Sequence, residues 1–527
     1  MWIASNVFKF YKKFFLNYFI KISIFFFILT VNLAYSQVVS KVFIKFIIVE
    51  NSTVIPKKEI NKIISPYENK YLTFKEIKNI ASKITELYIE KGYITSRAYV
   101  PPQDLSKGIF HINVLEGKTG QIIIQGEHPF YTKNYILKFL KPLKEEKVFN
   151  KKLLERALLL LNDSKKLKVT ANLKKGKTPG TTDIILKVKS SFPFDATITY
   201  DNWGSKYTSR DRYGLNFSLG NVIIEGSTLG LAEIRGSSES KLRSYSISYN
   251  FPIGVKGWKM GFWYAAGDSN LGKELAVLNI KSYSRFLGFL ISYPLIKSVN
   301  KELTIQGSFN ALYSRQTMLN QTTAEDRIRY IQVELDYRRN KVTSQNLAQF
   351  SITQGLGTLF GGMSKSQYSS RYNASNTFTK FNFSFIRVQR LSNNFFLLLK
   401  FNSQYSDDIL YSSQNFYIGG PISLRGFMLT QYGGDSGYSF SSEIRWAPFK
   451  HKDLFQLLGF WDTGTVFLNH PYKGQERQRS LTGAGFGIRL NLPLDFSFLM
   501  DVGYPIHPDT DGKERHVNVY IKITKQF

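Results

Sequence analysis

The chain has 527 residues, of which 43% are hydrophobic, and it contains no cysteine. A chain of this length can form several domains with cores of their own, and the lack of cysteine excludes a disulfide scaffold, a cysteine-ligated metal site and cysteine catalysis. The formal net charge is +31, but the basic residues are spread over the whole chain, so no nucleic-acid partner is expected. An aromatic content of 15% suits lipid-facing strands.

The N-terminus has the layout of an export signal. Lys9, Lys12 and Lys13 form a basic region, Ile22 to Val31 is an apolar core, and the stretch Ala34-Tyr35-Ser36 has small residues at the positions that a signal peptidase reads. The alternative is a membrane anchor, but the uninterrupted apolar core is too short to cross about 30 Å of hydrocarbon. We therefore expect cleavage near Ser36. After that point no apolar stretch is long enough for a helical membrane span.

Residues 41–117 predict a small α/β unit. Lys41 to Glu50 is read as one strand, and Thr73 to Lys91 as a helix with apolar residues on one face. Thr73 and Glu76 have the spacing of a capping box, and Gly92 suits the position after the last turn. Two further strands are expected, at Ala98 to Pro101 and at Ile109 to Leu115.

A second unit repeats this plan up to residue 190. Its predicted elements are a strand at Gln121 to Gln125, helices at Thr132 to Leu140 and Lys151 to Asn162, and strands at Leu167 to Leu173 and Asp183 to Val188. The order β-α-α-β-β, present twice, is an internal repeat.

From Ser191 onward the apolar period changes to two. Phe381, Phe383 and Phe385, for example, alternate with Asn382 and Ser384. A soluble sandwich also alternates, but the length of this region, its large aromatic residues on one face and the export signal favour a transmembrane barrel. Strands of about 9–11 residues with their loops take about 20 residues each, so residues 191–527 suit about 16 antiparallel strands.

The final strand is the clearest one. Val517, Val519, Ile521, Ile523 and Phe527 lie on one face, and polar residues lie on the other. Lys525 interrupts the apolar face only at the membrane edge, where its long side chain can reach water. A last strand that ends in Phe resembles the assembly signal of outer-membrane barrels.

Five short motifs resemble those of two-partner secretion transporters, the haemolysin secretion/activation proteins of the ShlB/FhaC/HecB type. They are GYITSRAYVPPQDLSKGIFHINVLEG at 92–117, TPGTTDI at 178–184, YDNWG at 200–204, SLRGF at 423–427 and FWDTG at 460–464. The resemblance covers essentially all of residues 41–527. It implies a signal peptide (1–36), a first POTRA domain (37–117), a second POTRA domain (118–190) and an outer-membrane β-barrel (191–527).

The resemblance also implies a function. Family members carry one large exoprotein, such as a haemolysin or an adhesin, through the barrel, and their periplasmic POTRA domains recognise its N-terminal secretion domain in extended form. An exposed sheet edge suits this task, since an extended chain can add to it by backbone hydrogen bonds. Tyr99, Pro101 and Pro102 lie near such an edge and are candidates for cargo docking. The alternative is that the two prolines form a simple loop.

The same resemblance assigns an inward-folded loop to the barrel. Arg425, Gly426 and Phe427 belong to the loop motif, and Asp462 to the motif on a nearby strand. Arg offers a planar, permanently charged donor set, so an Arg425–Asp462 pair is expected to hold the loop in the lumen. The alternative is an ordinary loop Arg and an ordinary strand Asp.

The remaining expectations concern gating, enzyme activity, oligomeric state and alternative functions. Many family members have a helix before the first POTRA domain, whereas only Gln37 to Ser40 follow the expected cleavage site, so gating by a plug helix is in doubt. No nucleophile elbow, acid–base pair or metal-binding histidine spacing is found, so no enzyme activity, metal or cofactor is expected. The expected state is a monomer in outer-membrane lipid. A barrel-assembly factor is the alternative function, and a diffusion porin ranks last.

Overall fold

The computed structural model describes residues 41–237, 242–506 and 516–527, so the predicted signal peptide lies outside the described residues. The chain forms two compact units. One contains the described residues up to 119 together with 148–150 and 176–182, and the other contains the rest. Among the described residues, no helix is both long and apolar enough to cross a membrane.

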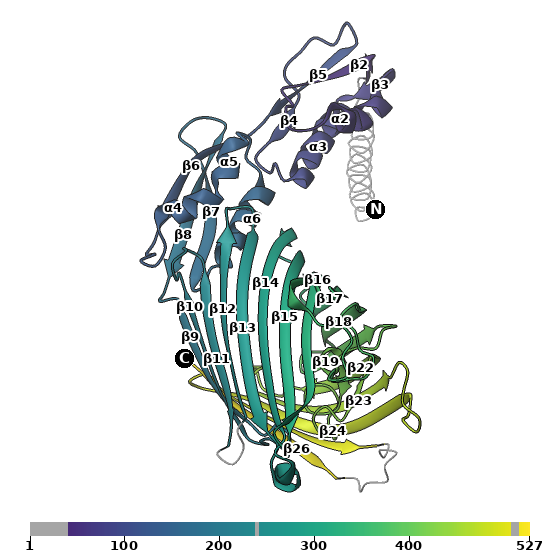
Figure 1. Cartoon of the computed structure of the whole chain (residues 1–527). Coiled ribbons are helices and arrows are strands. Elements are labelled where there is room, and N and C mark those ends of the chain that lie inside the picture. Colours follow the sequence, from purple (N-terminus) through teal and green to yellow (C-terminus); the bar gives the residue numbers. More distant parts are fainter. Residues whose placement is uncertain (1–40, 238–241, 507–515) are drawn as a thin grey trace, which may run out of the picture. The chain divides into compact units, whose positions relative to one another are not determined.

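The first unit is an α/β domain (Figure 1). Its elements are β1 (Lys41–Ile44), β2 (Phe46–Glu50), α2 (Lys57–Ile64), η1 (Ser65–Tyr67), β3 (Lys70–Thr73), α3 (Phe74–Lys91), β4 (Arg97–Tyr99) and β5 (Ile109–Leu115). The main sheet has the order β2-β5-β4, with β2 parallel and β4 antiparallel to β5. Ile80, Ile84 and Tyr88 of α3 are fully buried in its core beside Phe110 and Ile112 of β5.

Two expectations for this unit need correction. The strand predicted at Lys41 to Glu50 is two strands in different sheets, because the amides of Lys45 and Phe46 turn to the Gly108 carbonyl, at 2.7 and 3.2 Å. The predicted order β-α-α-β-β includes a second helix in this unit, but no residues were assigned to it, since the eight residues of α2 are too few to show a clear period. The capping box is confirmed. The Thr73 hydroxyl accepts from the Glu76 amide, and the Glu76 carboxylate accepts from the Thr73 amide.

The second unit begins with another α/β segment. Its elements are β6 (Lys118–Gln125), α4 (Lys133–Phe139), α5 (Lys141–Glu145), α6 (Lys151–Asn162), β7 (Leu167–Lys175) and β8 (Thr181–Ser190), and its sheet has the order β6-β8-β7. Helix α6 has the predicted bounds, whereas α5 was not predicted. Asp163, directly after α6, pairs with Lys259 and Lys297 of the following barrel at 3.1 and 3.0 Å.

The rest of this unit is a closed antiparallel barrel with 16 strands in the described residues, as predicted (Figure 1). The strands are β9 (Phe194–Asp201), β10 (Arg212–Gly220), β11 (Thr228–Gly236), β12 (Arg243–Ile253), β13 (Trp258–Asn270), β14 (Lys281–Ser298), β15 (Lys301–Met318), β16 (Gln321–Asn340), β17 (Ser344–Gly355), β18 (Thr379–Arg390), β19 (Phe395–Tyr405), β22 (Ser436–Trp446), β23 (Phe455–Phe467), β24 (Gln478–Leu492), β25 (Phe496–Pro505) and β26 (Asn518–Gln526). Short 3-10 turns η2 (Lys273–Leu278), η3 (Leu359–Gly361) and η4 (Ser412–Gln414) lie in the loops.

The final strand closes the barrel. β26 pairs antiparallel with β9, so that Ile523 lies opposite Tyr200 and the amide of Phe527 donates to the carbonyl of Ala196 at 2.9 Å. Asn202, from the YDNWG motif, extends this seam: its side-chain oxygen accepts from the Ile521 amide and its side-chain nitrogen donates to the Val519 carbonyl. The motif is therefore part of the closure of the barrel.

Candidate transport site

A long loop between β19 and β22, residues 406–435, folds inside the barrel. It contains the short antiparallel pair β20 (Phe416–Ile418) and β21 (Tyr432–Gly434). Its apolar side chains pack against the inward faces of β23 and β24 in one buried cluster, made of Ile418, Leu424, Phe427, Tyr432, Val466 and Leu481. We call residues 406–435 the inward loop.

Arg425, at the tip of the inward loop, is bound by Asp462 of β23. Its Nε and Nη2 atoms donate to the two carboxylate oxygens of Asp462 at 2.7 and 2.8 Å, and its backbone amide donates to the same group at 3.1 Å. The exposed fraction is 4% for Arg425 and 0% for Asp462. The structure thus brings together the two residues that the motifs paired. Because the pair is dry, breaking it costs far more than breaking an exposed pair.

Four further groups surround the guanidinium. Nη1 donates to Glu443 at 2.8 Å and lies 3.4 Å from Asp501, and Nη2 donates to the Ser441 hydroxyl at 3.2 Å. The carbon of the guanidinium lies 3.5 Å from the centre of the Phe460 ring. The two additional carboxylates have their own partners, since Arg445 binds Glu443 at 2.7 Å and Arg489 binds Asp501 at 2.6 Å. The buried charges therefore form one connected network, which we call the latch.

Gly426 and Phe427 bind the barrel through their backbone. The Tyr520 hydroxyl of β26 donates to the carbonyl of Phe427 at 2.6 Å, and the Asn518 side chain donates to the carbonyl of Gly426 at 2.7 Å. Gly426 has a φ of +97°, a conformation that favours glycine. The four residues predicted for the latch are thus all at one place, whereas Glu443, Asp501 and Tyr520 were not predicted because no motif marks them.

Gly483 of β24 lets the inward loop approach the barrel wall. A Cβ atom on Gly483 would lie 2.2 Å from the backbone oxygen of Arg425, and neither group can move cheaply. We expect Gly483→Ala to displace the tip of the inward loop. In the folded protein, Arg425 should then become a site of trypsin cleavage, because it would lose its burial. Gly459→Ala is the matched control, since a Cβ there meets nothing within 4 Å; equal cleavage of both variants would contradict the prediction.

A second ionic junction joins three loops at the opposite end of the barrel from the α/β segment. Arg371, in the loop between β17 and β18, forms an ion pair with Asp435, which is 0% exposed. The Asp435 carboxylate also accepts from the amides of Leu410 and Asn469, at 2.8 and 2.7 Å. The sequence did not indicate this junction, because its members come from three irregular loops.

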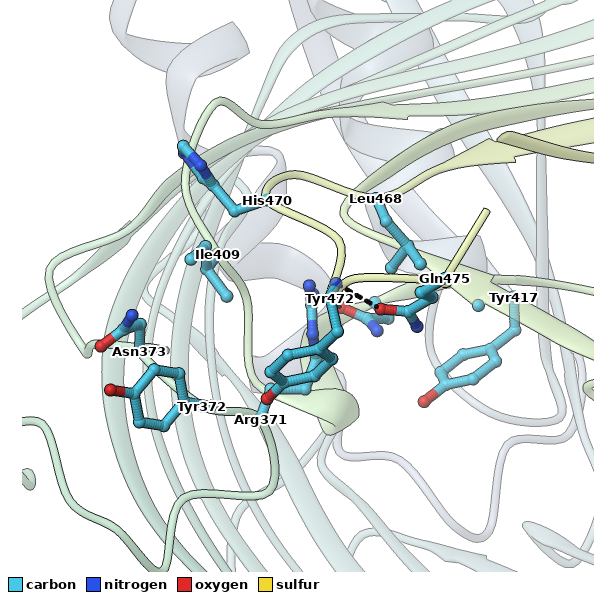
Figure 2. Close-up of a pocket in the computed structure, with 11 residues that line it drawn as sticks. Arg371, Tyr372, Asn373, Ile409, Tyr417, Leu468, His470, Tyr472 and Gln475 are labelled. Atoms are coloured by element: carbon cyan, nitrogen blue, oxygen red, sulfur yellow. Dashed lines mark hydrogen bonds between the residues drawn. The ribbon is translucent and has the colours of Figure 1, made fainter. Parts of the chain in front are cut away.

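A pocket of about 290 Å³ lies beside this junction. Figure 2 shows Tyr372, Tyr417 and Tyr472 around Arg371, together with His470. Within the 468–477 loop, the Tyr472 amide donates to the side-chain oxygen of Gln475 at 3.1 Å. The pocket belongs to the loops that the Arg371–Asp435 pair holds together.

The residues predicted to dock cargo lie at one edge of the first unit's sheet. Tyr99 ends the edge strand β4 and is 50% exposed, and Pro101 and Pro102 follow it. The backbone amide of Ala98, in the middle of β4, already has a hydrogen-bond partner, because it donates to the Thr85 hydroxyl at 3.0 Å. The geometry therefore leaves the Tyr99 side chain available, while strand addition at Ala98 would require Thr85 to move.

Glu116, the penultimate residue of the 92–117 motif, holds the first unit together. Its carboxylate accepts from the amides of Thr53 and Val54, at 2.7 and 3.2 Å, and from the Tyr88 hydroxyl at 2.7 Å. Burial acts to raise the pKa of Glu116, but these hydrogen bonds and the one from the Thr53 hydroxyl outweigh it, so that the pKa lies below its usual value. Burial likewise raises the pKa of Tyr88.

We expect Glu116→Gln to loosen the segment after β2. A depressed carboxyl pKa contributes stability above the unfolded value of the pKa, and that contribution is lost as the pH falls through the folded value. At neutral pH the charge is present, so its removal should increase amide hydrogen exchange at Thr53 and Val54 in the full-length protein. Glu90→Gln, on the exposed side of α3, is the control; unchanged exchange in Glu116→Gln would contradict the expectation.

The described ranges contain no group of three or more His, Cys, Asp or Glu residues that could hold a metal ion. What they do contain is a closed barrel, an inward loop held by a buried Arg–Asp pair, and α/β units that precede the barrel. This combination defines the class of outer-membrane barrels that carry POTRA domains.

Comparison with known proteins narrows the class to one family. The family described as haemolysin secretion/activation protein ShlB/FhaC/HecB matches residues 180–490, and the POTRA domain of ShlB type matches residues 42–117. The chain belongs to this haemolysin secretion/activation protein family. It is an outer-membrane transporter that secretes a large partner exoprotein, with its POTRA domains in the periplasm.

Individual relatives agree with this assignment. The heme/hemopexin transporter protein HuxB of Haemophilus influenzae is 24% identical over 495 residues, which are 90% of this chain and 85% of the relative. The outer membrane transporter CdiB of Escherichia coli is 26% identical over 507 residues, 91% and 82% of the two chains. The solved structure of CdiB from Escherichia coli superposes with a TM-score of 0.80 at 20% identity, and it covers 94% of this chain and 92% of that one.

Proposed function

We propose that the latch controls secretion by setting the position of the inward loop. The observation that carries this proposal is the burial of Arg425 among three carboxylates of the barrel wall, namely Glu443, Asp462 and Asp501. A loop tip held only by apolar contacts could shift easily, whereas this tip has an ionic anchor with fixed geometry. The loop can therefore occupy one defined position until the anchor is broken.

We also propose that the cargo binds the first POTRA domain in extended form. Tyr99, Pro101 and Pro102 offer an exposed aromatic ring and a rigid segment at the β4 edge. Gln103 holds that segment against β5, since it exchanges hydrogen bonds of 2.7 Å with the backbone of His111. At β4 we expect side-chain contacts. The other sheet edge, β2, is occupied in the same way at Ile47, whose amide donates to the Glu68 carboxylate at 3.0 Å.

The domain division, the oligomeric state and the class of partner are proposals as well. The domain division is a signal peptide at 1–36, POTRA domains at 37–117 and 118–190, and a barrel at 191–527. The transporter works as a monomer in outer-membrane lipid, without enzyme activity, cofactor or nucleic acid. The name of the Haemophilus influenzae relative refers to heme and hemopexin, but at 24% identity we extend to this chain only a secreted protein partner.

Deletion of the gene tests the proposed function. Secretion predicts that one large exoprotein disappears from the medium and returns when the wild-type gene is restored. An assembly factor, the alternative, predicts a broad loss of outer-membrane proteins. The latch is tested separately, by restoring the deletion strain with variants of Arg425.

A further inference from the structure

The outer wall of the barrel carries a patch of arginines on β14, β15 and β16. Up to the register shift after Pro294 in β14, and in β15 and β16 opposite it, the odd-numbered residues face outward: Ile331 and Val333 are 44% and 49% exposed, whereas Asp326 and Ile328 are buried on the inward face. The three strands are also long, with 18, 18 and 20 residues. A membrane strand needs only about 9–11 residues, so each strand extends beyond the bilayer.

The pairing of β14, β15 and β16 shows where the apolar outward face of these strands ends. Along β15 the outward residues from Leu303 to Ala311 are apolar, and this stretch follows the strand for about 27 Å, or about 19–22 Å along the membrane normal for a strand tilted by about 35–45°. That height is close to that of the apolar band of an outer-membrane barrel, which is about 25 Å. The next outward row reads Arg285, Tyr313 and Arg327 across the three strands.

Arg315 belongs to the row beyond, where it lies between Tyr283 and Glu325. From the strand spacing and the rise per residue, the three arginines are about 8–10 Å apart. All three are exposed. Glu325 lies 3.6 Å from Arg327, and the Thr322 hydroxyl accepts from Arg315 at 2.6 Å, so most of the positive charge faces solvent. We call Arg285, Arg315 and Arg327 the arginine patch.

An apolar group lies next to the arginine patch. The short turn η3 places Leu359 and Phe360 on the outside of the barrel, since the Phe360 ring lies 5.2 Å from the outward ring of Phe309. Leu359 is 60% exposed and Phe360 is 72% exposed. The nearby Arg329 is not part of the patch, because its guanidinium donates to the carbonyls of Phe360, Leu312 and Ile328.

We infer that the arginine patch binds the head group of an outer-leaflet lipid with more than one phosphate, of the lipid A type. The POTRA domains are periplasmic, and the patch lies at the opposite ends of the strands, so it faces the outer leaflet. Arginine binds phosphate by two parallel hydrogen bonds. Because the three arginines are about 8–10 Å apart, a single phosphate cannot contact all of them. Leu359 and Phe360 would contact the acyl chains.

Binding to the purified full-length protein tests the inference. Native mass spectrometry in detergent would compare bisphosphorylated lipid A with dephosphorylated lipid A, phosphatidylglycerol and inorganic phosphate. The variant R285Q/R315Q/R327Q should bind bisphosphorylated lipid A about 100-fold more weakly than the wild type, if each arginine contributes as basic residues near an anionic surface do. The single variants R285Q and R315Q should each show part of this loss. They replace the triple variant as the test if the triple variant does not fold.

The control is K301Q/R339Q. Lys301 and Arg339 lie opposite each other at the periplasmic ends of β15 and β16, so this variant removes two charges from the same outward faces. It should bind lipid A like the wild type. The inference is overturned if the variants of the arginine patch bind like the wild type, or if the control loses as much. It is also overturned if dephosphorylated lipid A, phosphatidylglycerol or inorganic phosphate binds as tightly as bisphosphorylated lipid A.

Discussion

Arg425→Ala is expected to lower secretion of the partner exoprotein at least about 10-fold while the barrel still assembles. The substitution leaves Asp462, Glu443 and Asp501 without their shared cation in a buried site. Removal of one partner from a buried ion pair typically costs about 3–5 kcal/mol, which changes an equilibrium between a docked and a released loop more than 100-fold. Secretion is measured in the medium of the deletion strain, and assembly by the heat-dependent migration of the barrel on a gel.

Two comparisons make this result specific. Arg425→Lys keeps the charge but loses the two-pronged contact with Asp462, so it should restore secretion only in part. Arg390→Ala removes an exposed arginine at the end of β18 and should secrete normally. Normal secretion by Arg425→Ala would remove the latch from the mechanism, and a failure of the barrel to assemble would assign Arg425 to folding.

The sequence predicted the parts of the structure that depend on local patterns. The capping box at Thr73 and Glu76 requires only a spacing of three residues. The alternation that ends at Phe527 predicts both a strand and its faces, because the side chains of a strand have a period of two. The motifs around Arg425 and Asp462 identified a pair of residues, and the structure shows that they are in contact.

What the sequence did not indicate depends on contacts between distant segments. Glu443 and Asp501 join the latch only because β22, β23, β24 and β25 are neighbours in the barrel, so that side chains from their inward faces meet around Arg425. The break in the first strand depends on Gly108, which is far away along the chain. Arg371 and Asp435 meet between irregular loops, where no periodicity exists to be read.

The Arg371–Asp435 pair leads to a second prediction with a large effect: Asp435→Ala should open the loops that this pair holds together. The Asp435 carboxylate is fully buried and accepts from the Leu410 amide, the Asn469 amide and Arg371, so its loss leaves the two amides without their acceptor and Arg371 without its carboxylate. Each unsatisfied buried group costs about 1–3 kcal/mol, which is enough to separate the three extracellular loops. We expect protease added to intact cells to cut the 356–378 and 468–477 loops of this variant, and the conductance of the barrel in a planar bilayer to rise.

Asp407→Ala is the matched control for this prediction. Asp407 is an exposed carboxylate of the inward loop, bound to the hydroxyl of Tyr405 at 2.6 Å, so its removal changes the charge without opening the junction. Arg371→Ala should have a smaller effect than Asp435→Ala, because the two backbone amides still satisfy the carboxylate. The order of the effects therefore distinguishes a junction built around Asp435 from a simple ion pair. If Arg371→Ala and Asp435→Ala open the loops equally, the ion pair alone holds them, and if neither does, the loops are held by their apolar contacts.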